Sequence, residues 1–212
     1  MIRITVLLLA TAAVSFGGTV FTLNTTALES SAAGPFTLDF QFIDGSGFGD
    51  GNNTVTLSDF DFGGGSVDTT PAFVTGGVNV STGPLGVTLT DSSFLNEVQF
   101  SLTPGSSLSF LFDSTSNPDT GAPDTFTFAI DDGSGLEIST TNPSGFDSFV
   151  EVDLPSDSSG ASTTLSSSAP GASVTLSAPT SGPTSSVPEP SAFLPLAAAA
   201  LWAVRRKSRQ RS

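Results

Sequence analysis

The residues with the clearest potential for chemistry lie in a glycine-rich loop, residues 44–53, which reads Asp-Gly-Ser-Gly-Phe-Gly-Asp-Gly-Asn-Asn. Its carboxylate and amide side chains belong to Asp44, Asp50, Asn52 and Asn53. Ca²⁺ takes about six to eight oxygen ligands, and such a loop can supply carboxylate, amide and backbone carbonyl oxygens around one point. The loop therefore predicts a Ca²⁺ site with a structural role.

The same loop also has a simpler interpretation, because Asp, Asn and Gly are the usual residues of a long hairpin turn. Its spacing departs from the EF-hand pattern, which needs a late bidentate Glu and flanking helices. Two further carboxylates, Asp131 and Asp132, follow a segment similar to residues 40–44. They would join the loop if the two similar segments form neighbouring strands.

The composition excludes most catalytic chemistry. The sequence contains no His, Cys or Tyr, so Ser-His-Asp catalysis, thiol catalysis and most zinc sites are excluded. A glycosidase-like pair of carboxyl groups remains possible, but no specific pair stands out. Asp59, Asp61, Glu97, Glu137 and Glu151 lie on predicted strands, where an exposed strand face explains them. We therefore predict that the protein is not an enzyme.

These candidate residues must be positioned by β-strands, because apolar residues recur at every second position. Phe36, Leu38, Phe40 and Phe42 alternate with polar residues, which is typical of a strand buried on one face. Similar alternation predicts about ten short strands. Their apolar residues fall at 21–23, 36–42, 55–57, 60–62, 78–80, 87–89, 98–102, 108–112, 126–130, 136–138 and 150–154.

The turns between these strands are rich in Gly, Pro and Asp, and no helical stripe occurs between the two ends of the chain. We predict an all-β fold, an antiparallel β-sandwich of jelly-roll-like type with a core of Phe. At Ser58 and Asp59 the alternation slips by one residue. A β-bulge there would return Phe60 and Phe62 to the inner face. A β-helix or a propeller would need a regular repeat, which is missing.

Charge is distributed unevenly along the chain. The formal net charge is −14, Arg3 is the only basic residue before Arg205, and residues 18–187 hold 19 acidic residues without Lys or Arg. Nucleic acid and anionic lipid are bound by cationic groups, so an acidic surface repels both and attracts divalent cations. We therefore expect no nucleic-acid partner.

Residues 1–17 have the parts of a secretory signal peptide. Arg3 precedes an apolar core at residues 4–14, and the small residues Ser15 and Gly17 mark a cleavage site after Gly17. A cut near residues 31–33 would discard a plausible first strand. A retained N-terminal strand or anchor is the alternative.

The composition changes at Pro155. Residues 155–186 are mostly Ser, Thr, Ala, Gly and Pro, with Asp157 as the only charged residue. Such a segment has too little apolar surface to offset the entropy of ordering, so we predict a flexible linker that is open to O-glycosylation. One added strand at residues 172–178 is the alternative. The β-sandwich domain is therefore predicted to span residues 18–154.

Residues 187–212 have three parts in a defined order. A Pro-rich motif comes first, an apolar segment at 191–204 follows, and a basic stop ends the chain. The apolar segment predicts a transmembrane helix of roughly 21 Å, shorter than the roughly 30 Å hydrocarbon core, with its C-terminus in the cytoplasm. A simple tail anchor is the alternative. The motif is Val187, Pro188, Glu189 and Pro190, and the stop contains Arg205, Arg206, Lys207, Arg209 and Arg211.

This arrangement resembles the PEP-CTERM sorting signal of exported proteins from Gram-negative bacteria that make extracellular polymer. The domain body is similar to an uncharacterised, β-rich group of PEP-CTERM proteins in residues 34–42, 49–57, 59–65 and 123–130. The resemblance implies an exosortase as processing partner, anchoring in the inner membrane before processing, and delivery to the cell surface or outside the cell. It implies no activity.

From these features we expect a non-enzymatic protein of the cell surface or extracellular matrix, associated with exopolysaccharide or biofilm. A carbohydrate-binding module for matrix polysaccharide is the alternative. Trp202, the only Trp, lies in the C-terminal apolar segment, so such a module would bind sugars through Phe, acidic and amide side chains.

Overall fold

The computed structural model describes residues 14–45, 49–117, 121–154, 162–166, 175–176 and 180–181. The chain divides into two compact units, Met1–Gly182 and Pro183–Ser212, and the first contains every described residue. Helical structure within these ranges is a 3-10 turn, η1 (Thr26–Leu28), and no helix there has the length and hydropathy of a membrane span. The predicted transmembrane helix and most of the predicted signal peptide lie outside the described residues.

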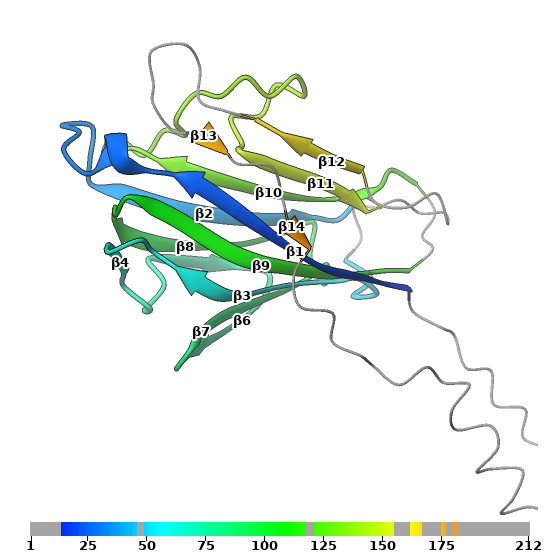
Figure 1. Ribbon diagram of the computed structural model, residues 1–212. Helices are drawn as coiled ribbons and strands as arrows, with labels where there is room; N and C mark the ends of the chain where they lie inside the picture. Colours follow the sequence, from blue (N-terminus) through cyan, green and yellow to red (C-terminus); the bar gives the residue numbers. More distant parts are fainter. Residues whose placement is uncertain are drawn as a thin grey trace, which may run out of the picture. The chain divides into compact units, whose positions relative to one another are not determined.

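Two antiparallel sheets form the fold (Figure 1). Sheet A has the order β13-β1-β9-β3-β7-β6, and β14 also pairs with β1. Its strands are β1 (Val14–Asn24), β3 (Thr54–Asp61), β6 (Gly77–Thr82), β7 (Leu85–Thr90), β9 (Ser107–Ser116), β13 (Thr175–Leu176) and β14 (Thr180–Ser181).

Sheet B has the order β12-β11-β10-β2-β8-β4, and β5 also pairs with β8. Its strands are β2 (Phe36–Ile43), β4 (Ser66–Val67), β5 (Phe73–Thr75), β8 (Leu95–Thr103), β10 (Asp124–Asp131), β11 (Val150–Leu154) and β12 (Ser162–Leu165). The very short β4 and β5 were not predicted from the sequence, because they are too short for an alternating pattern.

Phenylalanine rings hold the two sheets together. The ring centroid of Phe110 on β9 lies 5.6 Å from that of Phe40 on β2 and 5.2 Å from that of Phe128 on β10, both edge to face. Phe112 and Phe126 make another contact between the sheets at 5.0 Å. Because alternate side chains share one face of a strand, the apolar set of each strand enters one common core. The predicted all-β sandwich with a Phe core is confirmed.

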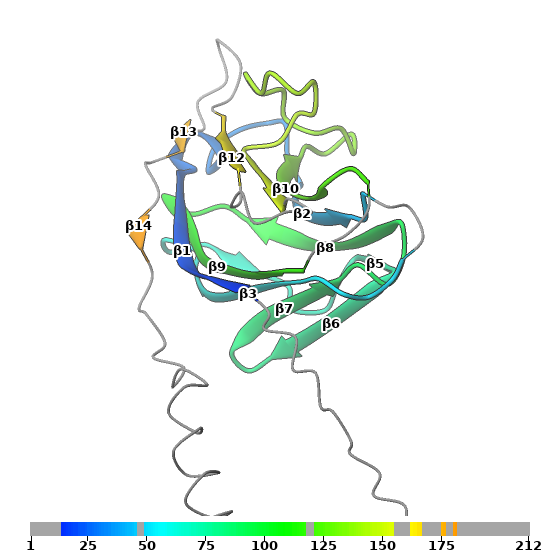
Figure 2. The same cartoon turned by 90° about the vertical axis from the view of Figure 1, so that its right-hand side faces the viewer.

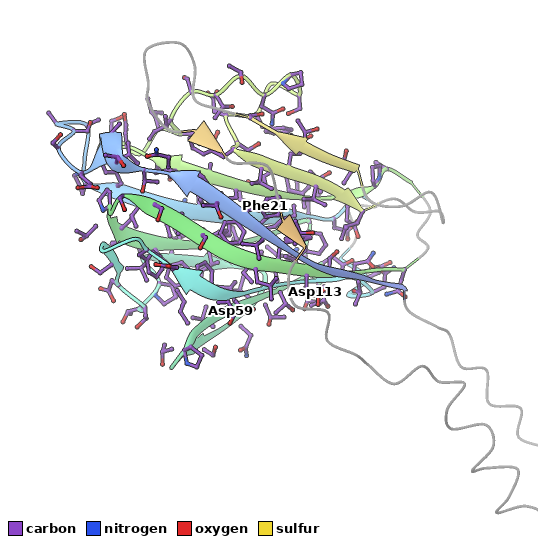
Figure 3. The ribbon with its side chains drawn as sticks, viewed as in Figure 1. Phe21, Asp59 and Asp113 are labelled. Atoms are coloured by element: carbon purple, nitrogen blue, oxygen red, sulfur yellow. The ribbon has the colours of Figure 1, made fainter. Side chains whose placement is uncertain are left out.

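The predicted β-bulge in β3 is also present. The pairing of β3 with β9 shifts register between Ser58 and Asp61, and Asp59, labelled in Figure 3, has a φ of 51°. Phe60 and Phe62 pack against the core, and the ring of Phe60 lies 5.8 Å from that of Phe110. The extra residue therefore returns Phe60 to the inner face.

No strand forms at residues 136–138, so the prediction of a strand there is wrong. Leu136 is 68 % exposed, and this segment makes only a single bridge, between Glu137 and Asp131. The chain forms a tight turn instead, in which the Asp132 N–H donates to the Leu136 carbonyl at 2.8 Å and Gly135 has a φ of +76°. Residues 132–148 thus form a long loop, which leads from β10 to Phe149, just before β11.

The predicted linker also needs correction, because parts of it join both sheets. β12 pairs with β11, from Leu165 opposite Val150 to Ser162 opposite Asp153. β13 and β14 pair with β1, as Figure 2 shows at the edge of sheet A, and β13 falls within the alternative strand at 172–178. The edge strand of a sheet has unpaired backbone N–H and C=O groups. A Ser- and Thr-rich segment can pair with these groups although it buries little apolar surface.

β1 begins before the predicted signal-peptide cleavage site. Residues 14–16 pair with residues 114–116 of β9, and the register then shifts between Phe16 and Thr19. Phe21 and Leu23, which are buried in the core, follow this shift. A cut after Gly17 would therefore leave the core-forming part of β1 in place. The cleavage itself remains a prediction.

Candidate metal site at one end of the sandwich

The predicted glycine-rich loop lies at the end of the sandwich where several strands begin or end. β2 ends before Asp44, β3 begins after Asn53, β7 ends before Asp91, β9 ends before Asn117, and β10 begins at Asp124. These strands belong to both sheets, so polar residues of both sheets gather at this end. We call the following residues the end cluster: Asp44, Asp50, Asn52, Asn53, Asp91, Asn117 and Asp124.

Asn53 is the centre of the hydrogen-bond network. Its backbone N–H donates to both carboxylate oxygens of Asp91, at 3.1 and 3.0 Å. Its Nδ2 donates to Asp124 Oδ2 at 2.7 Å, and its Oδ1 accepts from the Asn117 N–H at 2.6 Å. Because Asn53 is buried, these bonds connect sheet A with sheet B away from water.

Asp44 closes the glycine-rich loop. Its buried carboxylate accepts from the backbone N–H of Gly49, and the N–H of Gly45 donates to Asp124 Oδ1 at 2.9 Å. Gly49 has a φ of +67°, and a Cβ at this position would lie 2.5 Å from the Ser92 carbonyl oxygen. The position therefore requires glycine for both its backbone conformation and its close contact.

Asp50 and Asn52 form the outer part of the loop. Asp50 accepts from the backbone N–H of Asn52 at 3.2 Å and from Asn52 Nδ2 at 2.8 Å. Asn52 Oδ1 is buried and has no hydrogen-bond donor, so it is available as an oxygen ligand. The structure thus brings the four residues that were predicted from the sequence, Asp44, Asp50, Asn52 and Asn53, into one cluster.

Two further carboxyl groups complete the end cluster. Asp91 and Asp124 are both buried, and their side chains are close enough to share a hydrogen bond when one of them is protonated. Burial, with repulsion from Asp124 and Asp50, raises the pKa of Asp91 to about 7, although the Asn53 N–H favours its charged form. Burial, with repulsion from Asp44, also raises the pKa of Asp124.

The end cluster has the chemistry of a cation site. A glycosidase holds its two carboxyl groups roughly 5–9.5 Å apart around its substrate, whereas Asp91 and Asp124 are buried and interact directly with each other. Ca²⁺ could take the place of a proton between them. No three acidic side chains in the described part of the chain are already arranged to hold a metal ion. The cluster therefore offers suitable oxygens, which Ca²⁺ would have to draw closer together.

Sequence reasoning missed Asp91, Asn117 and Asp124, and it wrongly assigned Asp131 and Asp132 to this loop. The two similar segments do form neighbouring strands, β2 and β10. They are antiparallel, however, so Thr125 pairs with Ile43 while Asp131 lies at the far end of β2. An antiparallel pairing of the two segments would have pointed to Asp124.

The carboxylates predicted on exposed strand faces do not all lie there. Asp59, Asp61 and Glu137 are exposed. Glu97 and Glu151 are buried, so the prediction is wrong for these two. Glu151 accepts from Asn142 Nδ2 at 2.9 Å and from Ser144 Oγ at 2.6 Å, which shows that the loop of residues 132–148 covers it.

A small hollow of about 100 Å³ lies on sheet A beside the end cluster. Thr54, which follows Asn53 directly, donates its N–H to Thr115 Oγ1 at 2.9 Å at this hollow. Ligand pockets usually measure roughly 300–1,000 Å³, so the hollow fits water molecules rather than a sugar. It is lined by Thr54, Thr56, Asp113 (labelled in Figure 3), Ser114 and Thr115.

Comparison of the chain with protein-family models, with curated proteins and with solved structures finds no match. The sorting motif at residues 187–190 and the basic stop at residues 205–211 lie outside the described residues.

Lowering the pH from about 8 to about 5 should stabilise the chelator-treated protein. A carboxyl group whose pKa rises on folding binds its proton more tightly in the folded state. The free energy of unfolding therefore increases as the pH falls from about 7, the pKa of folded Asp91, toward the ordinary value of 3.8. Asp39 and Asp131, on sheet B, shift in the same direction. Urea unfolding at both pH values measures the change.

The Asp91→Asn variant should show a weaker pH dependence, because it lacks one of these titrating groups. Asp132 does not contribute to this pH dependence, because hydrogen bonds from Ser134 lower its pKa and keep it charged between about pH 5 and about pH 8. An unfolding free energy that is equal or lower at the acidic pH would contradict the burial of uncompensated carboxyl groups.

Proposed function

We propose that the protein is an exported, non-enzymatic protein of the cell surface or extracellular matrix, sorted by a PEP-CTERM signal that an exosortase processes. The observation that carries this proposal is the distribution of charge. The basic residues are Arg3 and those at 205–211, whereas the sandwich strands carry carboxylates without Lys or Arg. Basic residues at the two ends are what a leader peptide and a cytoplasmic stop require.

A jelly-roll-like topology is part of this proposal, and the strand order supports it. Two runs of the chain, from β1 to β4 and from β7 to β10, place successive strands alternately in sheets A and B, whereas β6 and β7 are neighbours in sheet A and β10, β11 and β12 follow one another in sheet B. The same architecture occurs in lectin and capsid domains, which act by binding and assembly, but a fold alone does not determine a function. The sorting signal and the acidic surface carry the functional argument.

Ca²⁺ is the cofactor that fits the end cluster, in a structural role. One bound ion would offset two of the negative charges of Asp44, Asp50, Asp91 and Asp124, where sheets A and B are joined through Asn53. Extracellular calcium modules bind with dissociation constants of roughly 10⁻⁴–10⁻³ M. Ca²⁺ would thus stabilise the sandwich outside the cell, where the chain has no disulfide to do so.

Adding Ca²⁺ to chelator-treated protein should raise its melting temperature, because an ion that binds only the folded state shifts the unfolding equilibrium. At about 100 times the dissociation constant the gain is about 2.7 kcal/mol for one site. The Asp91→Asn variant should lose a substantial part of this gain, and Glu29→Gln, a change at an exposed carboxylate, should retain it. Differential scanning fluorimetry measures both. No shift, or an equal shift with Mg²⁺, would refute a specific end-cluster site.

The form of the protein recovered from outside the cell should lack both of its ends. Intact-mass spectrometry should show one cut after Gly17 and a second near residues 187–190, with added hexose if residues 155–186 are glycosylated. Replacing Pro188, Glu189 and Pro190 by Ala should keep the chain in the membrane fraction with its basic tail attached. Recovery of the full-length wild-type chain from the cytosol would disprove sorting.

A carbohydrate-binding module is the second candidate, and the outer face of sheet B favours it. Gln41 Nε2 donates to Asp39 Oδ2 at 2.7 Å, and Gln99 Nε2 donates to Glu97 Oε1 at 2.9 Å. Phe73 on β5 pairs with Gln99 and is 46 % exposed. Asp39 and Glu97 are themselves buried and hold the half-buried amides of Gln41 and Gln99, so the exposed ring and these amides would supply the apolar and polar contacts that small-ligand sites use.

Glycan-array binding distinguishes the two candidates. If the protein is a carbohydrate-binding module, it should bind matrix polysaccharide, and Phe73→Ala should remove most of that binding. Phe146→Ala changes another exposed Phe, on the loop of residues 132–148, and should have no effect. A protein that binds no glycan on the array would leave the structural role as the function.

A further inference from the structure

The outer face of sheet B holds a second group of carboxylates, separate from the end cluster. Asp39 on β2 and Asp131 on β10 are only 3 % and 7 % exposed, and Glu97 on β8 is also buried. Glu137 joins them from the loop after β10, because it forms an antiparallel bridge with Asp131. We call Asp39, Glu97, Asp131 and Glu137 the face cluster.

The strand register places Asp39 in the middle of the face cluster. Asp39 pairs with Gln99 on β8 and with Ala129 on β10. Glu97 lies two residues before Gln99, and Asp131 lies two residues after Ala129. Both therefore lie on the same face of the sheet as Asp39, as its diagonal neighbours. Diagonal neighbours of this kind are roughly 7–8 Å apart. Two Asp side chains at this spacing can reach one ion, since Ca²⁺–oxygen distances are about 2.3–2.6 Å.

Two buried oxygens of the face cluster have no hydrogen-bond donor. Gln41 donates to Asp39 Oδ2, but Asp39 Oδ1 has no partner, and neither has Asp131 Oδ1. A buried polar atom without a partner costs about 1–3 kcal/mol, and more if it is charged. The two oxygens belong to the two acids that the register makes diagonal neighbours. A ligand that both can bind would remove both deficits at once.

The part of the chain that the structure describes has no basic residue that could neutralise these acids, because none occurs between Arg3 and Arg205. Burial, with repulsion from Glu97 and Asp131, raises the pKa of Asp39 to about 7. Burial, with repulsion from Glu137, Glu97 and Asp132, raises the pKa of Asp131 to about 6. The negative charge of these buried carboxylates must therefore be compensated by protons or by a bound cation. One divalent cation can compensate two carboxylates.

We infer that the face cluster binds Ca²⁺ through Asp39 Oδ1 and Asp131 Oδ1, and that the exposed side chain of Glu137 turns toward the ion as a third ligand, since no three acidic side chains in the described ranges are already arranged to hold a metal ion. Glu137 follows the turn that the Asp132 N–H and the Leu136 carbonyl close at 2.8 Å. The ion therefore fastens the start of the long loop, residues 132–137, to the outer face of sheet B. Its site is distinct from the end cluster, which lies beyond the ends of the strands.

Calcium titration of the full-length chain, after a chelator has removed divalent ions, tests this inference. Isothermal titration calorimetry should show that the wild type binds one more Ca²⁺ than Asp39→Asn or Asp131→Asn, or binds it at least about tenfold more tightly, a difference of about 1.4 kcal/mol. The control variant Glu29→Gln changes the net charge equally at an exposed position and should bind like the wild type.

Thermal unfolding distinguishes a bound cation from a simple protonated acid. Asn has the shape of Asp without its charge, so Asp39→Asn should melt at or above the wild-type temperature in chelator. In saturating Ca²⁺ the order should reverse, because only the wild type gains the face-cluster ion. If Asp39→Asn keeps the same advantage in both conditions, the carboxyl group is only protonated and the inference is wrong.

The Asp91→Asn variant reports on the end cluster independently. Reduced Ca²⁺ binding in Asp91→Asn, together with full binding in Asp39→Asn and Asp131→Asn, would overturn the face-cluster site and leave the end-cluster proposal standing. The reverse pattern would support the face cluster and refute calcium at the end cluster. Reduced binding in all three variants, with Glu29→Gln unchanged, would support both sites.

Discussion

The absence of basic side chains from the sandwich is the constraint on which the rest of the structure depends. Within the described residues a buried carboxylate cannot form an ion pair with Lys or Arg, because no basic residue lies between Arg3 and Arg205. Amide side chains take that place: Asn53 donates to Asp124, Asn142 to Glu151 and Gln41 to Asp39. A neutral amide satisfies a carboxylate oxygen without cancelling its charge. The remaining charge has to be met by protons or by cations from solution.

Stability therefore comes from the phenylalanine core, and the carboxylates lie around it. The contacts between Phe40, Phe110 and Phe128 cross from one sheet to the other in edge-to-face geometry, which adds to the gain from apolar burial. The end cluster lies beyond the strand ends and the face cluster lies on the outer side of sheet B. Neither interrupts the core, so each can change its state of charge while the packing of the two sheets persists.

Most of the strands could be predicted because one face of each is apolar, and the bulge could be predicted because Asp59 breaks an otherwise regular alternation. The part of the end cluster that lies in residues 44–53 could also be predicted, because its candidate ligands are close together in the sequence. Asp91 and Asp124 come from other turns, and only strand pairing brings them to Asn53. The strands β12 and β14 were missed, and β13 was expected only as an alternative, because all three join sheets through their backbones, and composition does not record that.

β1 is the first strand of the chain, yet its partners are made late. It pairs with β9 on one side and with β13 and β14 on the other. Residues 107–116 and then 175–181 must therefore leave the ribosome before sheet A can be completed around it. Contacts so distant in sequence slow folding. Sheet A therefore stays incomplete until a late stage of synthesis, and until then the backbone N–H and C=O groups of β1 lack the partners that β9, β13 and β14 supply.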